Sequence, residues 1–334
     1  ITEILGGKPT HPVSGIPGGQ TKALSEEGRV EIEQMARSCV AFAEFSLELF
    51  EDVVLKNPGY MQLVMNPKLG HRLYNMGMVD ERNRVSFYDG VIRVTDQEGH
   101  EFVRFEPEDY LDHVAEHVLD WSYVKVAYLK KVGYRGLTDG PGSGLYRVGP
   151  LGRLNVADGM ATPKADAACQ KFYETFRTKP VNSTLAFHWA RLIELLYASE
   201  RALELATDRE ITGTDIRNMN FRMQSRGVGV VEAARGTLFH DYELTEDRLV
   251  RRVNLIVATT NNKGPICLSI QAAARNLIHQ GRVDEGLLNT VEMFFRAYDP
   301  CFGCASHVLG RPPLVVDILG PDRKLVRRLE SAEH

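Results

Sequence analysis

Residues 299–307 read Asp299-Pro300-Cys301-Phe302-Gly303-Cys304-Ala305-Ser306-His307, a C-x-x-C-x-x-H cluster led by an Asp-Pro pair. Two thiols and an imidazole at this spacing can converge on one metal ion. The Asp-Pro pair predicts a turn, because proline fixes φ and aspartate bonds nearby backbone. Gly303 is expected to let the chain fold tightly enough for both cysteines to face the same ion. The alternatives are half of a zinc site, or two buried thiols beside a core histidine.

The composition agrees with a large, soluble, cytosolic enzyme subunit but does not by itself identify one. The chain has 334 residues, 43% hydrophobic and 25% charged, so it can bury a sizeable core in one or two domains. A formal net charge of -4, with lysine and arginine spread along the chain, gives no indication of nucleic-acid binding. No apolar run is long enough to span a membrane. Five cysteines, at positions 39, 169, 267, 301 and 304, do not predict a secreted disulfide framework.

The spacing of apolar residues predicts a helix-rich α+β fold with long core helices, inserted β-hairpins and small sheets, in one body over residues 1–307. Ser25 predicts a helix N-cap, and Cys39 lies on the apolar stripe of the helix that follows, so it is expected in the core. Glycines over 133–157 predict a loop, whose Gly140-Pro141-Gly142-Ser143-Gly144 is expected to be structural rather than a phosphate cradle. Helices are expected over 30–54, 163–171, 184–206, 264–279 and 285–297. Strands are expected over 84–105, as a hairpin turning at 96–99, and over 227–234 and 248–260, separated by a turn near Asp241.

Three further segments occur upstream of the cluster. They are Gly6-Gly7-Lys8-Pro9-Thr10-His11-Pro12 with Pro17-Gly18-Gly19, then Glu232-Ala233-Ala234-Arg235-Gly236-Thr237-Leu238, then Leu255 to Asn262. Together with the cysteine cluster, and in the same order, they resemble the motifs of the large (catalytic) subunit of nickel-iron hydrogenase, over essentially the whole chain. Residues 144–151 and 296–304 look most like the cytosolic, methyl-viologen-reducing type, which is linked to heterodisulfide reductase in methanogenesis.

The resemblance implies the fold of that large subunit, together with the reversible, heterolytic cleavage of H2 into protons and electrons. The implied cofactors are a nickel-iron centre with CN and CO ligands on the iron, and a structural magnesium. The chain has no cysteine set for an iron-sulfur cluster. Electrons are therefore expected to leave through an iron-sulfur small subunit that carries such clusters, and then through an electron-transfer adaptor to heterodisulfide reductase.

Site roles follow from the resemblance residue by residue. Cys301 would be a terminal nickel ligand and the proton acceptor, and Cys304 would bridge nickel and iron. Arg235 would lie over the centre and bond an iron-bound cyanide, with Asp299 anchoring it through a charge-assisted pair. Thr259 would bond another cyanide. Taken without the resemblance, Arg235 also fits a surface arginine at a strand end, and Thr259 fits a β-branched strand residue.

The end of the chain carries two further expectations. His307 would bind the magnesium together with the carbonyl of Leu255. A dedicated endopeptidase would cut after His307, so residues 308–334 are predicted to be a C-terminal extension that is removed on maturation.

The chain also departs from the family pattern. It lacks the N-terminal R-x-C-G-x-C-x-x-H motif that supplies the other two nickel thiolates, and it begins at Ile1, so we expect a missing N-terminal part. Ala234 stands where the family has proline. Two other classes of protein remain as alternatives. One is a non-catalytic, hydrogenase-like scaffold subunit of a respiratory redox complex. The other is a zinc-stabilised interaction protein, which would need two more ligands.

Overall fold

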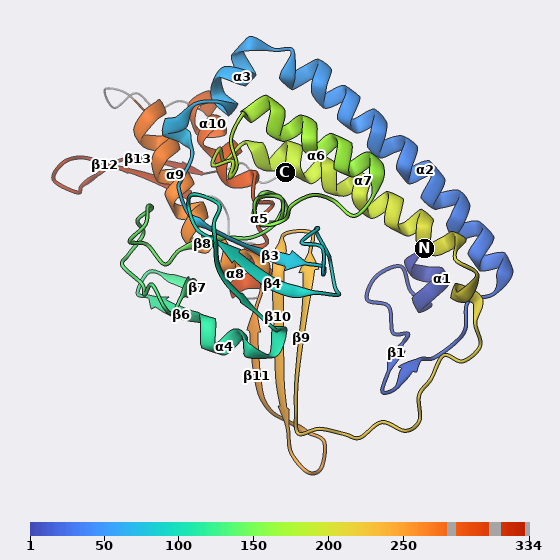
Figure 1. Cartoon of the computed structure of the whole chain (residues 1–334). Coiled ribbons are helices and arrows are strands. Elements are labelled where there is room, and N and C mark those ends of the chain that lie inside the picture. The colour runs from blue at the N-terminus through green and yellow to red at the C-terminus, as the bar shows by residue number, and fades with distance from the viewer. Residues whose placement is uncertain (279–284, 307–314, 331–334) are drawn as a thin grey trace.

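The computed structural model describes residues 1–278, 285–306 and 315–330 (Figure 1). The helices are α1 (Thr2–Gly6), α2 (Glu26–Phe50), α3 (Pro58–Val64), α4 (Tyr110–His113), α5 (Pro150–Val156), α6 (Pro163–Phe176), α7 (Ala186–Thr207), α8 (Ala258–Asn261), α9 (Lys263–Leu277), α10 (Glu285–Arg296) and α11 (Phe302–Ser306). A π-helical segment continues α2 over Glu51–Leu55, and short 3-10 turns cover Pro67–Leu69, Pro107–Asp109 and Arg209–Thr212. The strands are β1 (Gly15–Ile16), β2 (Gly19–Gln20), β3 (Tyr74–Val79), β4 (Val91–Thr95), β5 (Glu101–Phe105), β6 (Val114–Leu119), β7 (Ser122–Leu129), β8 (Tyr146–Arg147), β9 (Arg226–Ala233), β10 (Gly236–Leu244), β11 (Val250–Ile256), β12 (Val315–Leu319) and β13 (Leu325–Glu330).

Helix α2 is the long blue helix along one edge of the molecule in Figure 1, and it packs against α7. Its start is the predicted one, because Ser25 Oγ accepts a hydrogen bond from the Gly28 amide at 3.1 Å. Glu26 and Glu27 occupy the first turn, where negative charge favours the helix. The buried face of α2 consists of Ile32, Ala36, Val40 and Ala43, together with Gly28.

The predicted apolar stripe of α2 is therefore wrong in part. Cys39 is exposed rather than in the core, and the side chains of Phe42 and Phe45 are also exposed. Small residues such as Ala36 and Ala43 face inward because they let two helices approach closely. The two aromatic side chains Phe42 and Phe45 consequently lie on its outer side.

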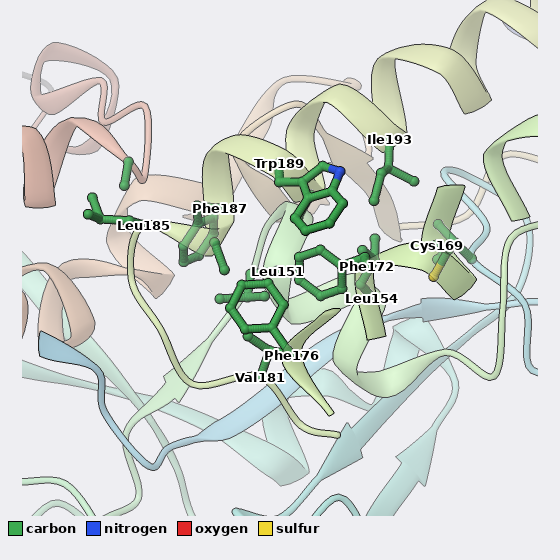
Figure 2. Packing of buried hydrophobic residues seen from close by; sticks show 14 of the residues in the cluster. Leu151, Leu154, Cys169, Phe172, Phe176, Val181, Leu185, Phe187, Trp189 and Ile193 are labelled. Atoms are coloured by element: carbon green, nitrogen blue, oxygen red, sulfur yellow. The ribbon is translucent and has the colours of Figure 1, made fainter. Parts of the chain in front are cut away.

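The main hydrophobic core lies between α5, α6 and α7. Figure 2 shows Trp189 of α7 beside Phe172 of α6, whose ring centroids are 5.2 Å apart, and Leu151 and Leu154 of α5 nearby. Helix α5 is buried along its whole length and begins at Pro150, a residue suited to a first helical turn. The loop predicted over 133–157 is therefore wrong over β8 and α5, although residues 140–144 do form a loop.

A four-stranded sheet with the order β5-β4-β3-β8 packs against α5. Its β3 and β8 run parallel, and its other neighbours are antiparallel. The predicted hairpin is confirmed as β4 and β5, whose turn closes with the Asp96 amide donating to the His100 carbonyl at 2.8 Å. Strand β3 is fully buried and places the centre of this sheet inside the molecule.

A second sheet, with the order β11-β10-β9, is antiparallel and extends away from the helices in Figure 1. The prediction of two strands with a turn near Asp241 is wrong, because Asp241 lies within the central strand β10. The predicted strand over 248–260 ends at Ile256, and residues 258–261 form α8 instead. At the end of this sheet nearest the helices lie the β9-β10 turn and α8, which both reach the candidate site.

Within the described ranges, no helix is both long and apolar enough to cross a bilayer. Past the cysteine cluster, β12 and β13 pair as an antiparallel hairpin that includes an ion pair between Asp317 and Arg328. This hairpin occupies most of the predicted C-terminal extension.

Candidate metal centre

Cys301 and Cys304 lie one helical turn apart at the start of α11, joined by a disulfide with Cα atoms 5.3 Å apart. The Cys304 amide donates a hydrogen bond to Cys301 Sγ at 3.3 Å. Gly303 has no left-handed φ, and a Cβ at this position would meet no atom within 4 Å. The role predicted for Gly303 is wrong, because the helical turn alone brings the sulfurs together. A metal can bind the pair only after reduction to thiolates.

Asp299 precedes the cysteines in a tight turn, as the Asp-Pro pair predicts. Its φ is 50°, a left-handed value that aspartate tolerates better than most residues, and its amide donates to the Arg296 carbonyl at 2.9 Å. The turn aims the Asp299 carboxylate and carbonyl toward the end of the three-stranded sheet. Pro300 then leads directly into the cysteine pair.

Arg235 lies at the tip of the tight β9-β10 turn and reaches Asp299. Its Nε donates to the Asp299 carbonyl at 2.6 Å and lies 3.2 Å from Oδ2 of the same residue. The two side chains are 42% and 46% exposed, so this ion pair adds little to stability. Its effect is to hold the guanidinium against Asp299, two residues before Cys301.

Thr259 lies in α8, and its Oγ1 accepts a hydrogen bond from the Cys301 amide at 3.1 Å. Thr259 thus holds the backbone of the first cysteine. Leu255 lies in β11, opposite His240 of β10. His307, the predicted magnesium ligand, lies outside the described residues. Arg235, Asp299, Thr259 and the two cysteines are brought together from three parts of the chain.

Two glycines let the backbone pack against the Arg235 turn. Gly149 has a φ of 87°, and a Cβ there would lie 2.8 Å from the Arg235 carbonyl oxygen. Gly236 has a φ of 136°, and a Cβ there would lie 2.3 Å from a Val148 methyl group. Larger residues would therefore force the two segments apart. Asn262 completes the contact, since its Oδ1 accepts from the Val148 amide at 3.0 Å.

Behind this turn lies a buried charge cluster that the sequence did not predict. Arg153 of α5 is 1% exposed, and its guanidinium bonds Glu194 of α7 through Nε and a terminal nitrogen, each at 2.6 Å. Its other terminal nitrogen bonds Glu232 at 2.6 Å and the Ala233 carbonyl at 2.8 Å. A fifth contact, at 3.4 Å, reaches the Ala234 carbonyl. All five N–H donors of an arginine are thereby used.

Glu232 is held from both sides. Its other carboxylate oxygen accepts from the Met78 amide at 2.9 Å and from Thr237 Oγ1 at 2.8 Å. Burial raises the pKa of Glu232, whereas the Arg153 guanidinium acts in the opposite direction. The available signal for this cluster was an arginine within the apolar run Pro150 to Val156, where only a paired charge can be buried.

The donors present fit one side of a soft-metal site. Thiolates suit nickel and low-valent iron, and a nearby guanidinium suits an anionic ligand of such a metal. In residues 1–278, 285–306 and 315–330, no group of three or more His, Cys, Asp and Glu residues could hold a metal ion. The cysteine pair can supply two thiolates, and a complete centre needs further ligands.

Comparisons with known proteins agree with this geometry. The family model for nickel-dependent hydrogenase matches residues 142–307, which include Arg235 and both cysteines of the pair. The chain is 44% identical to an iron-sulfur subunit of the F420-non-reducing hydrogenase of Archaeoglobus profundus, over 99% of this chain and 68% of that relative. The chain belongs to the nickel-dependent hydrogenase family. It is also 39% identical to a subunit of the F420-non-reducing hydrogenase of Methanothermobacter marburgensis, over 92% of this chain and 63% of that protein.

The solved structures confirm the predicted hydrogenase fold. A crystal structure of an NAD+-reducing [NiFe]-hydrogenase in the H2-reduced state superposes with a TM-score of 0.83 at 36% identity, covering 91% of this chain and 65% of that one. The resemblance to the methyl-viologen-reducing type is likewise confirmed by the F420-non-reducing relatives. These relatives are named as subunits, and the chain spans about two thirds of their length, between 63% and 68% in the two sequences above.

Proposed function

We propose that this chain is the catalytic part of a nickel-iron hydrogenase that splits H2 reversibly into two protons and two electrons. The observation that supports it most is the meeting of Arg235, Asp299 and Thr259 at the Cys301–Cys304 pair. These residues are far apart in sequence, and the β9-β10 turn, α8 and the start of α11 bring them to one place. A simple zinc knuckle would not require Arg235 at this position.

In this proposal the two reduced cysteines, Cys301 and Cys304, would hold the nickel-iron centre through their thiolates. When bound, the centre supplies the soft, electrophilic metal that polarises H2. Once reduced, the Cys301 thiolate would take up the proton, and the Cys304 amide, which lies 3.3 Å from Cys301 Sγ, would stabilise negative charge on that sulfur.

Arg235 and Thr259 would hold the two cyanide ligands of the iron, which also carries CO. Arg235 donates its Nε hydrogen to the Asp299 carbonyl, and its terminal nitrogens retain N–H donors for an anion. Thr259 Oγ1 accepts from the Cys301 amide, so its hydroxyl hydrogen stays available as a donor. Asp299 fixes the direction of the guanidinium.

Electrons would leave through an iron-sulfur small subunit, then through an adaptor to heterodisulfide reductase in the cytoplasm. The names of the relatives, which are those of subunits, support a multi-subunit enzyme. His307 and the carbonyl of Leu255 would bind the structural magnesium. A maturation endopeptidase would cut after His307 and remove residues 308–334, including the β12-β13 hairpin.

The test is Cys304→Ser in the complete protein. A hydroxyl cannot replace a bridging thiolate, so we expect loss of bound nickel and of H2 uptake together, by elemental analysis and a hydrogen electrode. Cys39→Ser is the matched control, because Cys39 is an exposed, free cysteine on α2 and should leave both unchanged. Stoichiometric nickel in Cys304→Ser would refute the assignment.

A further inference from the structure

A further arginine, the partly buried Arg191 of α7, lies behind the candidate site on the Asp299 side. One of its terminal nitrogens donates to the Ala297 carbonyl at 2.7 Å, two residues before Asp299. Its Nε is buried and has no hydrogen-bond partner in the part of the chain that the structure describes. A guanidinium with a buried, unpaired nitrogen is stabilised by nearby negative charge.

The charged groups around Arg191 are the carboxylates of Asp299 and Glu194 and the guanidinium groups of Arg153 and Arg235. Burial lowers the pKa of Arg191, and the negative charges of Asp299 and Glu194 act against that change. Glu194 lies three residues further along α7, on the same face of the helix, and is already bonded to Arg153. Arg191 therefore has near it a carboxylate from each of two ion-paired groups: Glu194, which pairs with Arg153 in the core, and Asp299, which pairs with Arg235 at the site.

Arg153 and Arg191 both donate hydrogen bonds to backbone that leads directly into the site. Arg153 bonds the carbonyls of Ala233 and Ala234, which immediately precede Arg235. Arg191 bonds the carbonyl of Ala297, within the turn that ends at Asp299. The two segments that form the exposed Arg235–Asp299 pair are thus fixed from the buried side, through α5 and α7.

We propose that Arg191 is a positioning residue for the hydrogenase site, which sets the place of the Arg235–Asp299 pair over the cysteines. This inference rests on the proposed function, and it adds a residue that touches neither the cysteines nor Arg235 in the described contacts. Arg191 acts through the Ala297 carbonyl and through its charge on Asp299. Its loss should move the Arg235 guanidinium relative to Cys301 without removing any proposed metal ligand.

The test is Arg191→Met in the assembled enzyme, with three readouts: nickel content, kcat and KM for H2 oxidation, and the infrared bands of the iron-bound CN and CO. We expect nickel at the wild-type level, an unchanged KM and a kcat about 100-fold lower, the loss typical of a small misplacement of reacting groups. The cyanide bands should shift, because the donor from Arg235 has moved. Arg191→Lys, which keeps the charge and can still reach a carbonyl, should restore most of the kcat and the band positions.

The matched control is Arg201→Met, ten residues along the same helix, where Arg201 pairs with Glu204 at the surface. It should change none of the three readouts. Wild-type kcat and infrared bands in Arg191→Met would overturn the inference, and so would loss of nickel, which would mark a purely structural role. If Arg191→Met is insoluble, Arg191→Gln, which keeps a donor for the Ala297 carbonyl but loses the charge, is measured by the same readouts, and a smaller fall in kcat with shifted cyanide bands is expected; wild-type values in it would overturn the inference. A wild-type enzyme without nickel or H2 turnover would instead refute the proposed function itself.

Discussion

Replacing Arg153 by methionine should destabilise the fold more than most other single changes to a charged residue. The side chain is 1% exposed, and its guanidinium joins α5, α7 and β9 through Glu194 and Glu232, at 2.6 Å in each case. Methionine fills a similar volume but leaves both carboxylates buried without their cation. Breaking a buried ion pair from one side costs about 3–5 kcal/mol. That is a large part of the roughly 5–15 kcal/mol that stabilises a typical domain.

The free energy of unfolding, measured in urea on the purified protein, checks this figure. Arg37→Met is the control, because Arg37 is 61% exposed in its pair with Glu33 and should cost about 0–1 kcal/mol. Adding Glu194→Gln and Glu232→Gln to Arg153→Met should recover part of the loss, since the unpaired charges are then gone. A loss below about 1 kcal/mol in Arg153→Met would contradict the view that this cluster holds the three elements together.

Two further predictions concern the site and the response to acid. Arg235→Lys should keep nickel near the wild-type level and lower H2 turnover by orders of magnitude. The reason is that lysine lacks the planar fork that meets both the carbonyl and the carboxylate of Asp299. Unchanged H2 oxidation would refute the catalytic role of Arg235. Burial lowers the pKa of His188, in an apolar cavity between α2, α3, α7 and α10, to about 4 from an ordinary 6.5. The unfolded chain then takes up a proton before the folded one, so stability is full above pH 6.5 and falls as the pH drops toward 4. His188→Phe should reduce this loss in urea titrations at several pH values, whereas the same change at the exposed His100 should not; equal acid sensitivity in both variants would show that His188 is not responsible.

Local chemistry explains what the sequence could predict. Ser25 marks the start of α2 because a hydroxyl cap acts within three residues, and Asp299-Pro300 marks a turn for an equally local reason. The hairpin of β4 and β5 follows from alternation around a polar turn. The cysteines, Arg235, Asp299 and Thr259 were found through motifs, and their meeting in one place is a property of the fold.

Long-range pairing explains what the sequence alone could not predict. Asp241 is a turn-former in isolation, but in β10 its carboxylate accepts from Arg226 at 2.9 Å and from Tyr110 at 3.0 Å. Strand β10 was missed because these partners are distant in sequence or in a neighbouring strand. The sequence did not predict helix α5 for a similar reason. Arg153 can be buried there only because it pairs with carboxylates that are 41 and 79 residues away in sequence. Pattern alone does not reveal such partners.

The central claim is that Cys301 and Cys304 hold a nickel-iron centre, and metal analysis of the purified, active complete protein tests it most directly. Plasma emission spectrometry should find nickel bound in a fixed ratio to the chain, with zinc absent, and infrared spectra should contain the CN and CO bands of the iron. Zinc bound in place of nickel, with no such bands, would contradict the claim and favour a zinc-stabilised interaction protein.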